Sequence, residues 1–189
     1  MVTRAEHRRT TLLKLSAATT EAFEELGSAA TIDDIAERAG VSRRTVFRYV
    51  DSKEDLAYIH PVLWLEIFDD AVAEVADRPV RERLLHAAER ISRHIGSDPE
   101  PVKRAMAVAV ADPLLRGQVV ANQRWIARLA EEILDGDEDD EAVFRARVLA
   151  SAAMGVIDAA LTRWYASPPD VQLVDIVGAG LDYLAPIFD

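Results

Sequence analysis

Arginine dominates one short stretch of this chain: Arg43, Arg44 and Arg48 fall within six residues, and Lys53 follows soon after. A guanidinium presents N–H donors in a planar fork, which matches the edge of guanine and the oxygens of phosphate. The chemistry that these residue types predict is recognition of an anion, with DNA as the first candidate.

The arginines need a rigid support, and the residues before them predict one. Thr31 with Asp34 three residues on has the form of a capping box, so a helix is expected to begin at Ile32. Gly40 follows the last periodic residue, where a left-handed backbone closes a helix at little steric cost. Ser42 is the expected N-cap of a second helix. The stretch therefore predicts two short helices joined by a glycine turn.

The apolar residues of these two helices separate the core from the surface. Ile35, Ala36 and Ala39 form the inward face of the first helix, and Val46 and Val50 are expected to pack on it. The candidate DNA-binding residues are Thr31, Ser42, Arg43, Arg44, Thr45, Phe47, Arg48, Tyr49 and Lys53. A major-groove reader projects its donors from such a pair of helices. Composition and periodicity fit an ordinary helical hairpin with a solvated basic face equally well.

Lys53 is expected in the first turn of a third helix, which Ser52 and Asp55 would cap. A cation beside the positive end of a helix is locally unfavourable. An approaching anion such as phosphate would account for a lysine at this position.

The run from Thr31 to Leu56 resembles the N-terminal domain of the TetR family of bacterial transcriptional regulators. The shared pattern is T-I-x-D-I-A-x-x-A-G-V-S-x-x-T-x-[FY]-x-Y-x-x-S-K-E-x-L, and a match of this length is specific. The resemblance implies three helices for DNA, followed by a larger helical domain for ligand binding and dimerisation. Arg44 stands where the family often has glycine, which adds a guanidinium that is able to read a base. Phe47 stands where tyrosine is common, so a hydroxyl that would bond phosphate is missing.

The charge of the chain is unevenly distributed. The net charge is −11, yet residues 1–50 hold 8 Lys and Arg against 7 Asp and Glu, and the acidic excess lies in residues 51–189. The 189 residues, half of them apolar, are enough for one sizeable core or two small ones. A chain without cysteine forms no disulfide and has no thiol nucleophile. No apolar run is long enough to span a bilayer and no signal peptide is evident, so a cytoplasmic protein without a membrane partner is expected.

The remainder of the sequence predicts helices only. A first helix is expected from about residue 9 to Gly27, and a long one from Lys53 to about Asp77. Pro61 is expected either to kink the long helix or to leave one backbone hydrogen bond missing from it. Further helices are expected over 80–95, 102–110, 114–134, 141–165 and 170–188, separated by proline, glycine or acidic segments. The predicted fold class is all-α with about nine helices. The predicted domains are 1–52 for DNA binding and 53–189 for effector binding and dimerisation.

Small residues mark the long helix near the C-terminus. Ser151, Gly155 and Ala159 lie four apart on one face, which lets another backbone approach closely. In the TetR family the last two helices pair with their copies in a four-helix bundle, so a homodimer is expected. The alternative is a helix buried within the monomer. The candidate interface residues are Val148, Ser151, Ala152, Gly155, Val156, Ala159, Trp164, Val177, Leu181 and Leu184.

Large or adaptable apolar residues occupy the helices that the family wraps around an effector cavity. The candidate ligand-binding residues are Trp64, Phe68, Met106, Val110, Trp125, Leu129, Met154, Asp158 and Leu161. Most apolar residues of this kind are simply core. Asp158 is either a solvated surface residue or a polar group that orients a ligand in an apolar pocket.

Two C-terminal stretches point to a class of effector. DPLLRGQVVANQRWIARLAEEI and FRARVLASAAMGVIDAALTRW are similar, more loosely, to the TetR subgroup associated with the mycofactocin regulator, which is thought to accept acyl-CoA-like ligands. Arg124 and Arg128, four apart on one helix face, would then meet a carboxylate or a CoA phosphate. Solvated arginines on an outer face are the alternative.

The predicted function is a homodimeric repressor that binds an inverted-repeat operator in double-stranded DNA and is released by a small apolar effector. The sequence contains none of the common catalytic or phosphate-binding motifs, so no enzymatic activity or cofactor is expected. No metal site is expected either, because His86 and His94 lack a third ligand at suitable spacing. The rival functions are a small helical enzyme that uses Asp158 with a histidine, and a helical adaptor whose basic face meets an acidic protein.

Overall fold

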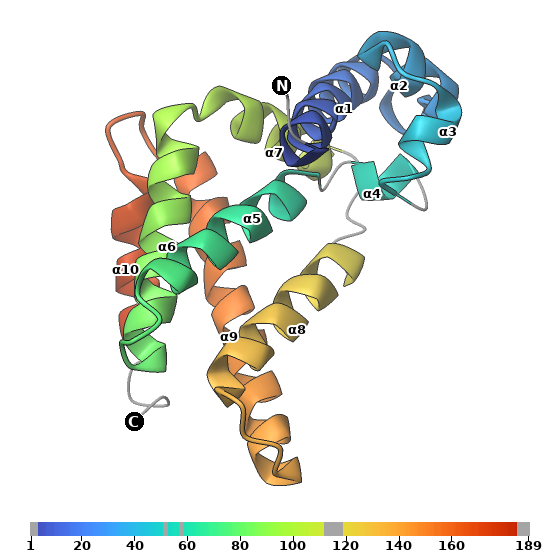
Figure 1. Ribbon diagram of the computed structural model, residues 1–189. Helices are drawn as coiled ribbons and strands as arrows, with labels where there is room; N and C mark the ends of the chain where they lie inside the picture. The colour runs from blue at the N-terminus through green and yellow to red at the C-terminus, as the bar shows by residue number, and fades with distance from the viewer. Residues whose placement is uncertain (1–3, 51–52, 57–58, 112–118, 185–189) are drawn as a thin grey trace. The chain divides into compact units, whose positions relative to one another are not determined.

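The computed structural model describes residues 4–50, 53–56, 59–111 and 119–184, and every regular element in these ranges is a helix (Figure 1). The all-α prediction is therefore confirmed. The chain forms two compact units, Met1–Leu63 with Glu100–Ala121, and Trp64–Pro99 with Asn122–Asp189. These units differ from the predicted domain ranges, because Lys53–Leu56 and a segment from the middle of the chain pack with the first helices.

The first unit holds the elements of the predicted DNA-binding stretch. They are α1 (Arg4–Leu26), the 3-10 turn η1 (Gly27–Ala29), α2 (Ile32–Ala39), α3 (Arg43–Val46) and α4 (Lys53–Leu56). Leu12, Leu15, Ile35, Val46 and Leu56 are almost fully buried in one apolar cluster, which joins all four α-helices. This shared core makes the helices a single rigid support. α1 begins five residues before the predicted start, so the arginines of its first turns lie on a helix.

Helix α7 (Glu100–Ala111) belongs to the same unit, although it comes from the middle of the chain. Val108 joins the apolar cluster of the first helices. Arg104 holds Glu24 of α1 with a forked contact, in which Nε donates to Oε1 at 3.0 Å and Nη2 donates to Oε2. This fork lowers the pKa of Glu24, because a hydrogen bond from a cation favours the carboxylate.

The long helix expected from Lys53 is described in two parts, α4 up to Leu56 and α5 from Ile59 to Glu74, because residues 57–58 lie outside the described ranges. Pro61 lies near the start of the described part of α5. The kink or missing backbone hydrogen bond expected at Pro61 stays a prediction.

The second unit contains most of α5 together with α6 (Val80–Ser97), most of α8 (Val119–Leu134), α9 (Asp140–Tyr165) and α10 (Leu173–Asp182). α10 packs on both α6 and α9, and it buries Leu173 and Val177. A side chain at Gly180 would meet Val156 of α9, with its Cβ 2.6 Å from the valine Cγ1. Glycine therefore allows α10 to approach α9 closely. α10 begins three residues later than predicted, after the Pro168–Pro169 break, and its predicted end at residue 188 lies outside the described residues.

Candidate DNA-binding site

The start of α2 is fixed by the predicted capping box. The Thr31 hydroxyl accepts the Asp34 N–H at 3.2 Å, and the Asp34 carboxylate accepts the Thr31 N–H at 2.9 Å. The hydrogen bonds from Thr31 lower the pKa of Asp34, because they favour its charged form. Thr31, one of the predicted DNA-binding residues, is exposed at this cap.

The turn and the second helix also follow the prediction. Gly40 closes α2 with φ 65 and ψ 36, in the left-handed region. Ser42 caps α3, since its hydroxyl accepts the Thr45 N–H at 3.1 Å. α3 has four residues and then tightens, because the N–H groups of Arg48 and Tyr49 bond the carbonyls three residues back. The second predicted helix is thus one α-helical turn followed by a tighter turn.

Side chains on this segment divide as their spacing predicts. Val46 is fully buried and Val50 nearly so. The outward residues are Ser42, Arg43, Arg44, Phe47 and Arg48, all exposed, with Thr45 and Tyr49 half-buried. Phe47 leaves 45% of its surface to solvent, a large exposed fraction for an aromatic residue. The structure therefore brings the predicted residues of α3 together on one face.

The arginines on this face have different surroundings. Arg43 donates from Nη1 to Asp33 Oδ2 at 2.8 Å, and its guanidinium lies 5.4 Å from the centre of the Phe47 ring. Arg48 lies 5.0 Å from the centre of the Tyr49 ring and donates to its hydroxyl at 3.1 Å. Within the described ranges, Arg44 has no hydrogen bond, ion pair or ring contact.

The sequence predicts that Lys53 meets a phosphate, but in the structure its ammonium group contacts the protein backbone. Its Nζ donates to the backbone oxygen of Ala30 at 3.0 Å and to that of Ser28. Both oxygens lie just before α2, so the lysine ties the start of α4 to the start of α2. One of its three N–H groups has no partner among these contacts. Ser52, the expected cap of α4, lies outside the described residues.

The comparison with known protein families decides the identity of this domain. Residues 15–57 match the family described as bacterial regulatory proteins, tetR family. Residues 15–57 are the DNA-binding domain of a TetR-family transcriptional regulator. Members of this family bind DNA and are not enzymes. A search of curated proteins gave no match.

Solved structures share the fold of this TetR regulator at low identity. The fatty acid degradation regulator FadR from Bacillus halodurans has a TM-score of 0.58 and 18% identity, covering 90% of this chain and 96% of that one. FadR from Thermus thermophilus, a TetR family repressor in complex with lauroyl-CoA, has 0.57 and 20%, covering 92% and 93%. FadR from Bacillus subtilis, in complex with stearoyl-CoA, has 0.56 and 17%, covering 91% and 96%. These likenesses extend the TetR fold over both units.

The predicted ligand-binding residues of the regulator are split between its two units. Trp64, Phe68, Trp125 and Leu129 are buried in the second unit, and the Phe68 and Trp125 rings meet edge to face at 5.6 Å. Met154 and Leu161 are half-buried in the same unit. Met106 and Val110 belong to α7 in the first unit, where Val110 is exposed. Asp158 is exposed, which favours its solvated alternative over a buried polar anchor.

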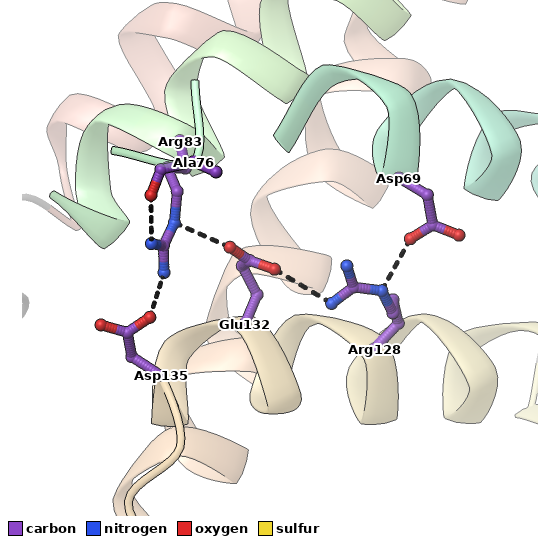
Figure 2. A network of polar contacts seen from close by, with 6 residues as sticks. All are labelled: Asp69, Ala76, Arg83, Arg128, Glu132 and Asp135. Carbon is purple, nitrogen blue, oxygen red and sulfur yellow. Dashed lines mark hydrogen bonds and ion pairs between the residues drawn. The ribbon is translucent and has the colours of Figure 1, made fainter. Parts of the chain in front are cut away.

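Arg128 contacts two acidic residues, Asp69 and Glu132 (Figure 2). It donates from Nε to Asp69 at 2.7 Å and from Nη1 to Glu132 at 3.1 Å, and its guanidinium lies 5.0 Å from the centre of the Phe68 ring. Arg124, by contrast, is exposed. The two arginines therefore do not form the matched pair of free cations that their spacing suggested.

Glu132 extends this network to a buried arginine of α6. Its Oε1 lies 2.8 Å from Nε of Arg83, which is only 8% exposed. Arg83 also donates to Asp135 at 2.6 Å and to the backbone oxygen of Ala76 at 3.2 Å (Figure 2). The hydrogen bond with Asp135 raises the pKa of Arg83. The network thus connects α5, α6 and α8, and the spacing of its residues in the sequence did not predict it.

The residues predicted to form the dimer interface differ in how far they are buried. Val148, Ser151, Gly155 and Ala159 are exposed along one face of α9. Ala152, Val156, Leu181 and Leu184 are half-buried. Trp164 and Val177 are buried in the single chain, each 4% exposed, which leaves little of either side chain for a partner chain.

Phe144 was missed as a candidate for this surface. It leaves 64% of its ring exposed and lies one turn before Val148 on α9. Its position four residues before Val148 was the available signal. Together, Phe144, Val148, Ser151, Gly155 and Ala159 form what we call the α9 stripe.

The described residues hold no group of three or more side chains placed to bind a metal ion. None of their helices has the length and apolar character needed to cross a membrane.

Proposed function

We propose that this TetR regulator is a cytoplasmic repressor, which binds an inverted-repeat operator as a homodimer and is released by an apolar effector of the acyl-CoA type. The observation that carries the DNA-binding part is the capped pair α2 and α3, which presents an exposed cationic face on a rigid core. The DNA-binding residues proposed are the nine predicted from the sequence. A reader of this size inserts one helix into the major groove.

The α9 stripe supports the homodimer. Its five residues are apolar or small, and all are exposed in the isolated chain. The small residues allow a second helix to approach, and Phe144 and Val148 supply apolar area to bury. A two-fold protein with one reader in each chain demands a two-fold site.

The buried aromatic pair supports the effector class. Phe68 and Trp125, with Trp64 and Leu129, supply the apolar surroundings that an acyl chain requires. Arg128 beside them is the cation that an anionic head would approach, in competition with Asp69 and Glu132. Two of the similar FadR structures hold lauroyl-CoA and stearoyl-CoA.

Release follows from linkage between the two ligands. An effector weakens the DNA complex only to the extent that it binds the non-reading conformation more tightly. The same factor by which the effector lowers DNA affinity must describe how DNA lowers effector affinity. This reciprocity makes the proposal quantitative.

The test combines operator selection with a series of effectors. Sequences bound from random double-stranded DNA are expected to contain an inverted repeat with half-sites about one helical turn apart. Butyryl-, octanoyl-, lauroyl- and stearoyl-CoA are then titrated against the selected operator. Affinity should rise with chain length, by at most about 0.8 kcal/mol for each buried methylene.

Each arm of this test can fail separately. Enrichment of no sequence would remove the operator-binding proposal. A flat response to chain length, or tight binding that leaves the DNA complex unchanged, would remove the acyl effector and leave DNA binding standing.

A further inference from the structure

An acidic residue lies within the cationic reading face. Asp33, in the first turn of α2, accepts a hydrogen bond from Arg43 of α3 at 2.8 Å. The same guanidinium lies 5.4 Å from the centre of the Phe47 ring. Arg43 is thus held between a carboxylate and an aromatic face, while its neighbour Arg44 has neither.

This ion pair is too exposed to stabilise the fold substantially. The side chains of Arg43 and Asp33 leave 59% and 66% of their surface to solvent. A surface pair of this kind contributes little to stability, because water screens its charges. Its larger consequence concerns DNA, because a carboxylate near phosphates repels them and occupies a cation that would otherwise neutralise one.

We propose that Asp33 is a specificity-setting residue, which acts by holding Arg43 over Phe47 and away from phosphate. The proposal rests on the DNA-binding face proposed above and assigns a role to a residue outside it. Binding to DNA of arbitrary sequence relies on phosphate contacts alone, so losing Arg43 weakens it directly. In the operator complex, base contacts also fix the position of α3. Holding Arg43 away from phosphate therefore lowers affinity for the operator less than affinity for random DNA.

The expected size of the effect follows from counterion release. Each phosphate contact contributes about 0.9 to the slope of log K against log salt concentration, which is roughly an eightfold change in affinity for each tenfold change in salt. Asp33→Asn keeps the size of the side chain but removes its charge. We expect this variant to bind random-sequence DNA about five- to ten-fold more tightly at low salt, with a slope steeper by about one. Operator affinity should rise two-fold at most, so the ratio of the two affinities falls.

Two matched variants separate this role from a general effect of charge. Glu37→Gln removes a negative charge from an exposed position one turn further along α2. It should change both affinities slightly and equally. Asp33→Asn in an Arg43→Gln background should do no more than Glu37→Gln, because Asp33 is proposed to act through Arg43. Thermal melting of each variant checks that the head remains folded.

The experiment uses the full-length chain with the selected operator and a random-sequence duplex of equal length, over a range of salt concentrations. Equal gains for operator and random DNA in Asp33→Asn, or gains that persist in the Arg43→Gln background, would overturn the proposal. Failure of the underlying function has a different signature: the unmodified chain would then show no preference for any selected sequence.

Discussion

At the scale of single residues, Arg44 is the cation of the reading face with the fewest restraints. Its neighbours Arg43 and Arg48 each lie against an aromatic ring, and Arg43 also holds Asp33. An unrestrained guanidinium in the first turn of the reader is free to fork onto guanine. We therefore predict that Arg44→Ala costs roughly 1 to 3 kcal/mol of operator affinity and relaxes base preference at one position.

Binding to a panel of singly substituted operators measures this change in preference. Arg9→Ala, which removes the same charge from an exposed position on α1, is the control. A uniform loss over the whole panel for Arg44→Ala would show that Arg44 contacts phosphate only.

Lys53 combines a structural contact with its proposed contact to phosphate. Two backbone oxygens before α2 accept hydrogen bonds from its ammonium group. Removing a donor from such oxygens typically costs about 1 to 3 kcal/mol. We predict that Lys53→Ala lowers the free energy of unfolding by about that amount. It should also weaken binding to all sequences alike and reduce the salt slope by about one.

Chemical denaturation and salt-dependent DNA titration measure the two effects on the same sample. Lys14→Ala removes an exposed lysine from α1 and controls for charge. An unchanged unfolding free energy would contradict the structural contact, whereas an unchanged salt slope would contradict the phosphate contact.

At the scale of elements, local rules were sufficient to predict the reader. Thr31, Gly40 and Ser42 each act on backbone groups within about four residues, so their types and spacing determine the caps directly.

Contacts between distant segments were beyond such rules. Arg128 and Asp69 are 59 residues apart, and Arg83 and Asp135 are 52 apart. Their meeting depends on how α5, α6 and α8 pack. The burial of Trp164 was unpredictable for the same reason, since an apolar helix position gives the same sequence pattern whether it packs within the chain or against a second chain. The docking of α7 on α1 through Arg104 and Glu24 likewise had no sequence signal.

The contact between α7 and α1 gives a prediction about pH. The pKa of Glu24 lies below its usual value of 4.5, because Arg104 donates hydrogen bonds to its carboxylate. This stabilisation is fully present above pH 4.5, and it is lost as pH falls through the lowered pKa. Glu24→Gln should therefore lower the free energy of unfolding at pH 7 by about 0.5 to 1 kcal/mol, as for an exposed ion pair. The difference from the unmodified chain should shrink below pH 4.5.

Denaturant titrations at several pH values measure this difference. Glu21→Gln removes a carboxylate from the preceding turn of α1 and should have a much smaller effect at every pH. A difference between Glu24→Gln and the unmodified chain that does not depend on pH would show that the ion pair contributes nothing.

At the scale of the whole molecule, the chain passes between its two units three times, at residues 63–64, 99–100 and 121–122. α5 is one continuous helix that contributes to both units. α7 lies in the sequence between two segments of the second unit and packs in the core of the first unit.

The proposed homodimer depends on the α9 stripe, and one substitution tests this interface. Gly155 is exposed in the single chain, and a Cβ added there meets no atom within 4 Å. Replacing a glycine inside a helix with glutamate also improves helix propensity, by about 0.5 to 1 kcal/mol. Gly155→Glu should therefore leave the monomer at least as stable as before. In a dimer the same change places two carboxylates in a desolvated contact, at a cost of several kcal/mol.

Analytical ultracentrifugation at micromolar concentration should accordingly show a dimer for the unmodified chain and a folded monomer for Gly155→Glu. The variant should also lose affinity for the full inverted repeat while retaining its weaker affinity for an isolated half-site, because only the coupling of two readers is removed. Ala127→Glu introduces the same charge at an exposed position of α8 and should remain dimeric. If Gly155→Glu stays dimeric, or the unmodified chain is a monomer, the α9 stripe does not form the interface.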